Sequence, residues 1–288
     1  MSNILVTGRS GQLGSELQDL TCLYPNETFI FTDKAELDIC KHKVVEEFII
    51  KNNINAIINC AAYTAVDKAE EQFELANKIN NLAIKNFAEI AKEYRIKLIH
   101  ISTDYIFDGT SHKPYVESDT PNPKSIYGKT KLDAEIAIHE VNPANTVIIR
   151  TSWVYSSYGN NFVKTMLRLG KEKEELGVIF DQIGAPTYAG DLAKAILEIL
   201  PKLNNDKVEI YHYSNEGLCS WYDFALAIFE YSENDIKLYP IETSQYPTAA
   251  KRPLYSILNT KKVVEKYKIQ IPFWKDSLLI CLKKINES

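Results

Sequence analysis

A glycine-rich turn near the start of the chain sets strong limits on the possible folds. A short run rich in β-branched residues, 3–7, is followed by Gly8, Gly11 and Gly14 and then by a segment of helical spacing at 15–20. Glycines at such a turn let main-chain N–H groups approach a diphosphate, and the N-terminus of the following helix favours its negative charge. The pattern Gly-x-x-Gly-x-x-Gly therefore predicts a strand, a dinucleotide-binding turn and a helix.

The alternation of strand and helix continues to about residue 150. Four further apolar runs have strand length, at 28–32, 56–60, 97–101 and 146–151. Three segments between them have helical periodicity, at 41–52, 79–94 and 127–140. Such alternation builds right-handed βαβ units in one parallel sheet, so we expect an α/β protein with a Rossmann-like, doubly wound sheet. The apolar stripe expected to cover that sheet in the second helix is Ile79, Ala83, Phe87, Ile90 and Tyr94.

The second half of the chain is less regular. Runs at 178–180 and 209–213 are typical of strands that return to the sheet, with a helix at 189–200 between them. We expect a dinucleotide-binding domain at 1–150 and a smaller, partly interleaved, mainly substrate-binding domain at 151–288, with 178–213 contributing elements to the Rossmann sheet. Ser220 is placed to cap a further helix, whose apolar face is expected to pack through Trp221, Phe224, Ala225 and Ile228.

Tyr127 and Lys131 are the clearest candidates for catalysis. Residues four apart share a face of a helix, so the phenol and the ammonium are expected to reach the same pocket. A tyrosine has a pKa of about 10, and bringing it near neutrality requires about 4 kcal/mol in favour of the phenolate, part of which a lysine cation supplies. Taken alone, such a pair is more often a solvated helix pair. The run at 97–101, however, leads into Thr103 and Asp104, which a buried strand would deliver to the same site.

The end of the second predicted strand is where the adenosine ribose of a dinucleotide is expected. Asp33 there suits the free 2′-hydroxyl of NAD, whereas Arg9 and Lys34 are placed to pair with the 2′-phosphate of NADP, and this choice stays open. Asp38 lies in a loop where the adenine would rest. An acid before the helix at 41–52 is equally typical of a cap or a solvated charge, so both interpretations stay open.

Loops are expected to border the site. Residues 61–64 would let a flat ligand lie against the main chain, and Asn80 is expected to tie the following helix to a neighbouring loop. The segment 105–124 is rich in proline and glycine and is expected to border or cover the site. Further on, Arg252 is suited to bidentate phosphate binding, although a lone arginine is more often a surface residue.

Composition excludes several classes of function. The net charge of −5 and the absence of a dense Lys/Arg block argue against nucleic acid as a partner. No apolar run approaches the ~20 residues that a membrane span needs, so we expect no membrane partner and a cytoplasmic location. The five cysteines contain no Cys-x-x-Cys and are expected to be free thiols, and the five histidines lack the spacing of zinc ligands.

Five segments together resemble one known family. They are 8–14 (GRSGQLG), 102–109 (STDYIFDG), 127–131 (YGKTK), 150–155 (RTSWVY) and 181–186 (DQIGAP). In this order they are similar to the dTDP-4-dehydrorhamnose reductases, which are extended short-chain dehydrogenases/reductases that act on sugar nucleotides. The resemblance runs from Ile4 to about Asn259, and the last four segments are far more specific than the glycine pattern.

The resemblance implies a reaction and a set of site residues. The C4 ketone of dTDP-4-dehydro-β-L-rhamnose would be reduced to dTDP-β-L-rhamnose, the last step of dTDP-L-rhamnose biosynthesis, with NADPH favoured and NADH also possible. Thr103, Tyr127 and Lys131 would be the catalytic triad. Besides Gly8, the implied cofactor residues are Gly11, Gln12, Leu13, Asp33, Asp38, Ile39, Ala62, Tyr63, Thr64, Tyr127 and Lys131. The implied substrate residues are Thr103, Asp104, Trp153, Asn160, Gln182 and Arg252.

Some members of that family are described with Mg²⁺ at a dimer interface built from acidic residues. Glu16 falls where one such acid would lie, but a glutamate in a first helical turn is more often there for the helix dipole. We therefore predict no metal ligands, leave Mg²⁺ as an open possibility, and name a homodimer as a possible assembly.

Two other functions compete with the reductase. One is a non-catalytic regulatory subunit that keeps the dinucleotide fold, against which the intact Thr103, Tyr127 and Lys131 argue, because a binder has no need of a proton donor. The other is an epimerase, dehydratase or reductase that acts on a different nucleotide sugar. A dehydratase is expected to carry an Asp-Glu pair directly after the hydroxyl residue, and Thr103-Asp104 lacks it.

Overall fold

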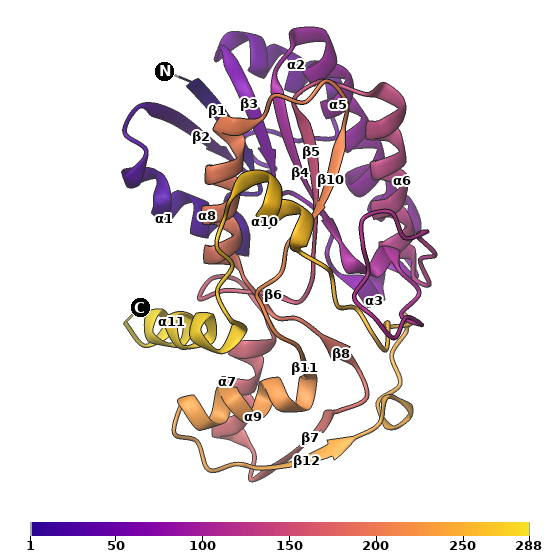
Figure 1. The fold of residues 1–288 in the computed structure, drawn as a ribbon, viewed down its shortest axis with the longest axis vertical. Helices are drawn as coiled ribbons and strands as arrows, with labels where there is room; N and C mark the ends of the chain where they lie inside the picture. The colour runs from indigo at the N-terminus through magenta and orange to yellow at the C-terminus, as the bar shows by residue number, and fades with distance from the viewer. Residues whose placement is uncertain (1, 288) are drawn as a thin grey trace.

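Helices cover both faces of a six-stranded sheet in the computed structural model, which describes residues 2–287 (Figure 1). The strands follow the order β10-β5-β4-β3-β1-β2, and every neighbouring pair is parallel. Their bounds are β1 Ser2–Thr7, β2 Glu27–Thr32, β3 Ile54–Asn59, β4 Lys97–Thr103, β5 Thr146–Thr151 and β10 Glu209–His212. The predicted Rossmann-like, doubly wound sheet is confirmed.

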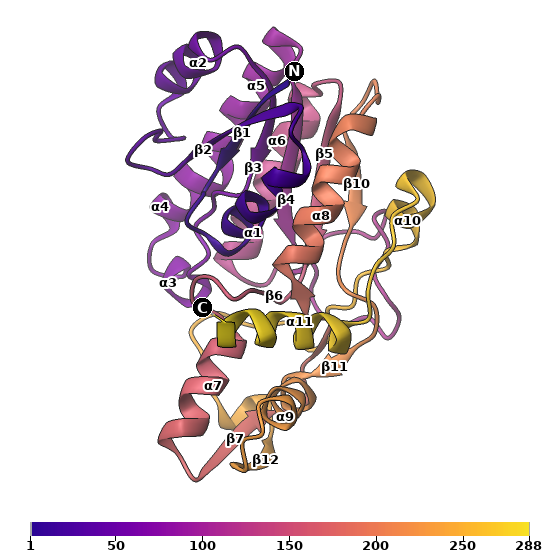
Figure 2. The same ribbon diagram turned by 90° about the vertical axis from the view of Figure 1, so that its left-hand side faces the viewer.

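The alternation of side chains along β1 divides the core into two layers. Ile4 and Val6 pack in one layer with α1 and α8, whereas Leu5 packs on the opposite face with α2, α5 and α6. Figure 2 shows α1 and α8 together on one side of the sheet. The helices are α1 Gln12–Leu20, α2 His42–Lys51, α5 Ala83–Tyr94, α6 Ile126–Val141 and α8 Ala189–Ile199. Because both faces are covered, apolar residues on both faces of the strands are buried, as Ile4, Leu5 and Val6 are on β1.

The strand order reverses beside β1. The strand that follows it in sequence, β2, lies on one side of it, and β3 lies on the other. Connections leave such a point in opposite directions and open a crevice at the carboxyl ends of the strands, where α/β proteins bind their ligands. Thr7, Thr103 and Thr151 end β1, β4 and β5 at this edge.

The helix before β4 contains a wide turn. Residues Lys78–Leu82 form a π-helical segment that leads into α5. Within it, the amide of Asn80 accepts a hydrogen bond from the main-chain N–H of Tyr63 at 2.8 Å and donates to its carbonyl at 3.1 Å, so the expected tie to a neighbouring loop is confirmed. Tyr94, expected in the core, is instead 37% exposed, because its hydroxyl bonds to Glu46 at the surface.

Much of the second half forms a smaller unit with its own core. Its main helices are α7 Phe162–Glu172, α9 Trp221–Tyr231 and α11 Trp274–Glu287, drawn in the lower half of Figure 1. Ser220 caps α9 in a reciprocal pair with Asp223, as expected.

Short elements elsewhere in the chain connect the main ones. They are α3 Val66–Ala69, α4 Phe73–Asn77, α10 Lys261–Tyr267, β6 Val154–Tyr155, β8 Ile183–Gly184, β9 Thr187–Tyr188, β11 Cys219–Ser220 and the short turns Thr21–Leu23, Asp104–Ile106, Leu200–Lys202 and Thr243–Gln245.

Residues 178–213 are shared between the two units. β10 lies beside β5 in the central sheet, and α8 packs on that sheet. The strand expected at 178–180 belongs instead to β7, Glu175–Ile179, which pairs with β12, Lys237–Ile241, outside the central sheet. The assignment of 1–150 to the dinucleotide and of 151–288 mainly to the substrate stays a prediction. In the part of the chain that the structure describes, no helix is long and apolar enough to cross a bilayer.

Candidate active site

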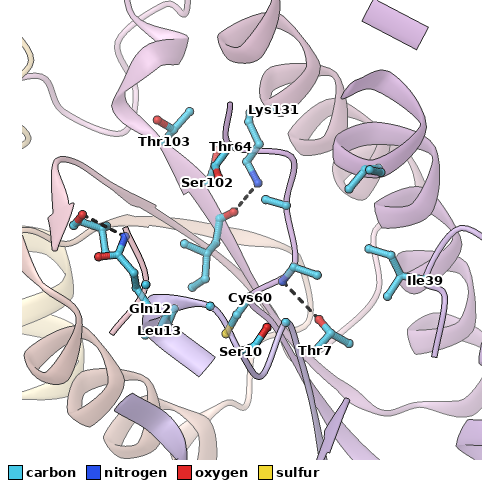
Figure 3. Close-up of a pocket in the computed structure, with 18 of the residues that line it drawn as sticks. Thr7, Ser10, Gln12, Leu13, Ile39, Cys60, Thr64, Ser102, Thr103 and Lys131 are labelled. Atoms are coloured by element: carbon cyan, nitrogen blue, oxygen red, sulfur yellow. Dashed lines mark hydrogen bonds between the residues drawn. The ribbon is translucent and has the colours of Figure 1, made fainter. Parts of the chain in front are cut away.

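A cavity of about 840 Å³ lies at the crevice beside β1, between the glycine-rich turn, the end of β4 and the loop after β5. Figure 3 shows Gln12 and Leu13 on one of its walls and Thr103 and Lys131 on another. Most of the predicted site residues line it: Gly8, Gly11, Gln12, Leu13, Asp33, Asp38, Ile39, Ala62, Thr64, Thr103, Asp104, Tyr127, Lys131, Trp153 and Asn160. The structure thus brings together the expected dinucleotide turn and the expected catalytic groups.

The glycine turn forms a cradle that side chains would fill. Gly8 has a φ of +72°, and a Cβ there would lie 2.9 Å from the main-chain nitrogen of Ala61. A Cβ on Gly14 would lie 2.2 Å from the carbonyl oxygen of Gly8. Both positions therefore need glycine to bring the turn, α1 and the start of the next loop together. Since the N-terminus of α1 favours negative charge here, the cradle fits the diphosphate of a dinucleotide.

Charged groups of both signs surround the end of β2. Arg9 pairs with Asp33 at 3.6 Å and with Glu36 at 3.1 Å, and Lys34 lines the cavity beside them. The acid suited to a ribose hydroxyl, Asp33, and one cation suited to a 2′-phosphate, Lys34, therefore line the cavity, whereas Arg9 lies beside them in ion pairs.

Asp38 also lines the cavity. Its carboxylate accepts a hydrogen bond from the main-chain N–H of Cys40, while Lys41 occupies the N-cap position of α2. The interpretation of Asp38 as the helix cap is therefore wrong.

Thr103 and Asp104 stand at the end of β4. The Thr103 hydroxyl donates to Asp104 Oδ1 at 3.0 Å and accepts from the main-chain N–H of Tyr105. Asp104 is 1% exposed, and burial raises the pKa of its carboxyl to about 6, against the lowering effect of Ser256 and Thr103. Its Oδ2 has no hydrogen-bond partner among the described residues. This oxygen is closed off from solvent, although Asp104 as a residue lines the cavity.

Tyr127 is partly buried on the first turn of α6 and packs edge-on against Tyr105, with ring centroids 5.6 Å apart. Burial raises the pKa of its phenol to about 12, Thr103 acts to lower this pKa, and the Asp104 charge raises it further. The phenol is therefore protonated at neutral pH and is able to donate its proton.

Lys131 is 2% exposed and points away from bulk water. Its ammonium donates to the carbonyl oxygen of Ile101 at 2.6 Å, the dashed line beside its label in Figure 3, and lies 3.2 Å from His100 Nε2. Burial lowers the pKa of Lys131 to about 8, although Glu135 opposes the shift. The expected lowering of the Tyr127 pKa by this lysine is wrong for this arrangement, because β4 holds the ammonium.

His100 is a neighbour of the site that sequence reasoning missed. It is fully buried in β4, with Nδ1 3.0 Å from the amide nitrogen of Asn59 and Nε2 facing Lys131. Burial and the Lys131 charge hold its pKa well below the usual range, so the ring is neutral. A lone histidine inside an apolar strand was the available signal.

A buried ion pair lies next to the cavity, outside its lining. Arg150 and Glu135, each about 2% exposed, are joined at 2.7 Å, and Arg150 Nε also contacts the carboxylate. The hydroxyl of Ser102, a residue that lines the cavity, donates to Glu135 at 2.5 Å. The pair thus joins β4, β5 and α6 next to the expected catalytic residues.

Two predicted substrate residues do not line the cavity. Gln182 is 2% exposed and bonds to Trp221 and Thr243. Arg252 forms a two-point contact with Asp67 on α3, at 3.1 and 2.7 Å.

Tyr63, predicted to bind the cofactor, also lies outside the cavity lining. Its main chain is bonded to Asn80 and its hydroxyl to Gln72.

The surroundings of Glu16 do not fit a magnesium ion. Its buried carboxylate accepts from Ser156 at 2.5 Å, from Tyr188 at 3.3 Å and from the Lys284 ammonium at 2.6 Å, and this ammonium also pairs with Asp19. Magnesium requires several free oxygen ligands in octahedral geometry. Here donors already occupy the carboxylate oxygens, and a tethered cation balances the charge. Among residues 2–287, no group of three His, Cys, Asp or Glu side chains is placed to hold a metal ion.

Comparisons with known proteins point in one direction. The family described as RmlD substrate binding domain matches residues 1–287. A dTDP-4-dehydrorhamnose reductase from Aggregatibacter actinomycetemcomitans is 41% identical over 96% of this chain and 97% of its own length.

Solved structures agree with this match. A dTDP-4-dehydrorhamnose reductase from Clostridium acetobutylicum has 42% identity and a TM-score of 0.93, with 99% of both chains covered. The enzyme of the same name from Bacillus anthracis, solved in complex with NADP, has 39% identity and a TM-score of 0.92, with 99% of this chain and 100% of the other covered.

Proposed function

Because the chain belongs to the RmlD family, whose relatives are dTDP-4-dehydrorhamnose reductases, we propose that it uses NADPH to reduce the C4 ketone of dTDP-4-dehydro-β-L-rhamnose to dTDP-β-L-rhamnose. The observation that carries the proposal is the single cavity that joins the glycine cradle to Thr103, Tyr127 and Lys131. A dinucleotide and a ketone would meet at the carboxyl ends of β1 and β4.

The residues of the cavity divide the chemistry among them. NADPH, held along Gly8, Gly11 and Asp33, would supply the hydride to C4. Tyr127, whose pKa of about 12 keeps it protonated, donates its proton to the oxygen that becomes the hydroxyl. The Thr103 hydroxyl, which donates to Asp104 Oδ1 in the structure, would turn to donate its hydrogen bond to the same oxygen, which stabilises the negative charge that develops there.

Two charged side chains complete the site. The Lys131 ammonium, anchored by the Ile101 carbonyl, would use its remaining N–H to hold a ribose hydroxyl of the cofactor. Asp104, which lines the cavity beside Thr103, would contact the sugar. Asn160 contributes a further polar group to the substrate side of the cavity.

The competing functions receive less support. A regulatory subunit would not need a protonated phenol beside a threonine hydroxyl in a dinucleotide cavity, whereas both are present. No described feature of the cavity favours an epimerase or a dehydratase over a reductase.

A direct assay tests the proposal. Purified protein is mixed with enzymatically prepared dTDP-4-dehydro-L-rhamnose, and the absorbance of NADPH and of NADH is followed in separate reactions. We expect NADPH to be oxidised with formation of dTDP-L-rhamnose, identified by mass spectrometry and NMR. Oxidation of neither cofactor would favour the regulatory subunit, and turnover of only a different nucleotide sugar would correct the substrate.

Replacing Arg9 and Lys34 together with alanine is expected to weaken the preference for NADPH. A hydrogen bond to a charged group contributes about 1.5 to 3 kcal/mol, so the ratio of kcat/KM for NADPH over NADH should fall about 10-fold to 100-fold. Steady-state kinetics with both cofactors measure this ratio. Arg95→Ala, at an exposed arginine outside the cavity, is the control. An unchanged ratio in the double variant would remove these cations from 2′-phosphate recognition.

The pH dependence of the reaction is expected to report on Lys131. With a pKa of about 8, its side chain carries a charge below that pH and loses it above, and the uncharged amine should bind the ribose hydroxyl of the cofactor less strongly. The value of kcat/KM for NADPH, which reports groups of the free enzyme, should therefore fall as the pH rises through about 8. Lys131→Met should be slower and lack this fall. The same fall in that variant would assign it to another group.

The proposal keeps three further expectations. Residues 1–150 mainly bind the dinucleotide, and residues 151–288 mainly bind the sugar nucleotide. The protein works in the cytoplasm, and cell fractionation tests this location.

The third expectation is a homodimer. Leu279 and Ile280, each about half exposed on α11, offer an apolar surface for it. Sedimentation equilibrium tests the dimer, and a monomer at all concentrations would contradict it.

A further inference from the structure

Trp153 has an unusual backbone at the edge of the cavity. It lines the cavity, and its φ is +48°, in the left-handed region that bulky side chains rarely adopt. A residue in this region is held there against a cost of about 1 to 3 kcal/mol by the structure around it. The neighbours that hold Trp153 are therefore part of the site.

Two residues of the smaller unit hold the Trp153 ring. The indole of Trp221 lies against it face to face, with centroids 3.5 Å apart and an interplanar angle of 7°. Gly184 provides the space for it, since a Cβ there would lie 2.3 Å from Cε2 of Trp153. The ring thus has one position, which Trp221 and Gly184 define.

Trp221 is fixed in its turn by neighbours outside the cavity. Its indole N–H donates to the side-chain oxygen of Gln182 at 3.2 Å, and the ring of Phe162 lies 4.6 Å away. The amide nitrogen of Gln182 donates to Thr243 at 3.0 Å. Trp221 itself does not line the cavity, so it acts on the contents of the cavity only through Trp153.

We propose that Trp221 is a positioning residue which, with Gly184, fixes the Trp153 indole as a flat wall against the apolar face of the deoxy sugar. This inference rests on the proposed function. Aromatic faces pack against apolar C–H surfaces, and their contribution depends on a fixed orientation. It also gives Gln182 an indirect role, because its amide orients Trp221.

The test compares Trp221→Ala, Trp221→Phe and Gly184→Ala with wild-type protein. Aromatic pairs contribute about 0.5 to 1.5 kcal/mol, so Trp221→Ala should raise KM for the sugar nucleotide by up to about tenfold. We expect kcat to change less than KM and Kd for NADPH to stay unchanged. Trp221→Phe should recover part of the loss, and Gly184→Ala should raise KM because it displaces Trp153.

Circular dichroism gives a second readout. The chain has three tryptophans, and the stacked pair should produce a coupled indole signal that Trp221→Ala removes. Trp274→Phe, in the core of the smaller unit, is the matched control and should keep both the signal and KM. Loss of the signal with an unchanged KM in Trp221→Ala would overturn the proposal. An equal rise of KM in Trp274→Phe would do the same, because it would indicate a general packing effect. A wild-type protein that does not turn the substrate over overturns the proposed function, and this inference with it.

Discussion

Replacing Tyr127 with phenylalanine is expected to lower kcat by about 10² to 10⁴, the usual contribution of one positioned proton donor. The phenylalanine ring keeps the packing against Tyr105, while the oxygen at C4 loses the proton that the phenol supplies at its pKa of about 12. Stopped-flow oxidation of NADPH measures the loss. Isothermal titration should give an unchanged Kd for NADPH.

Tyr155→Phe is the matched control for this variant. Tyr155 lies in the core of the smaller unit and is 1% exposed, and its hydroxyl has no hydrogen-bond partner among the described residues. Its removal should leave the rate unchanged. A Tyr127→Phe protein that turns over near the wild-type rate would refute the assignment of Tyr127 as the proton donor.

Arg150→Met is expected to have the largest effect on stability. The change leaves the Glu135 carboxylate buried without its partner, and breaking a buried ion pair from one side costs about 3 to 5 kcal/mol. This is a large fraction of the roughly 5 to 15 kcal/mol by which a folded protein is stable. Urea unfolding followed by circular dichroism measures the free energy of unfolding.

Two further variants separate charge from packing. Replacing both partners, Arg150→Met with Glu135→Leu, should recover most of the lost stability, because no buried charge is then left over. Arg168→Met removes a pair that is more than half exposed and should change the free energy of unfolding by no more than about 1 kcal/mol. A double variant as unstable as Arg150→Met would show that packing, and not the unpaired charge, causes the loss.

Local pattern was enough to predict the sheet and one wall of the cavity. The strands are apolar runs bounded by turns, and a glycine with a φ of +72° at Gly8 has a local cause that the sequence reveals. Thr103 follows directly from the end of β4, and Tyr127 and Lys131 from helical spacing. In each case neighbours within a few positions fix the geometry.

The missed contacts depend on segments far apart in the sequence. Arg252 bonds to Asp67, 185 positions away, and Gln182 reaches Trp221 only because β8 and β11 pair. The hydrogen-bond partner of Lys131 was also missed. Helical spacing shows on which face of α6 this side chain lies, but it does not show that its ammonium donates to the Ile101 carbonyl on β4. Polar partners of this kind follow from tertiary packing and leave no periodic signal.

The pairing of Lys284 with Glu16 has a consequence for synthesis of the chain. The two residues are separated by 268 positions and join α11 to the helix that follows the glycine cradle. A ribosome makes the cradle long before α11, so Glu16 lacks the Lys284 counter-ion until the chain has grown by a further 268 positions. During synthesis the helix after the cradle therefore carries a charge without its ion-pair partner until α11 has been made and has docked.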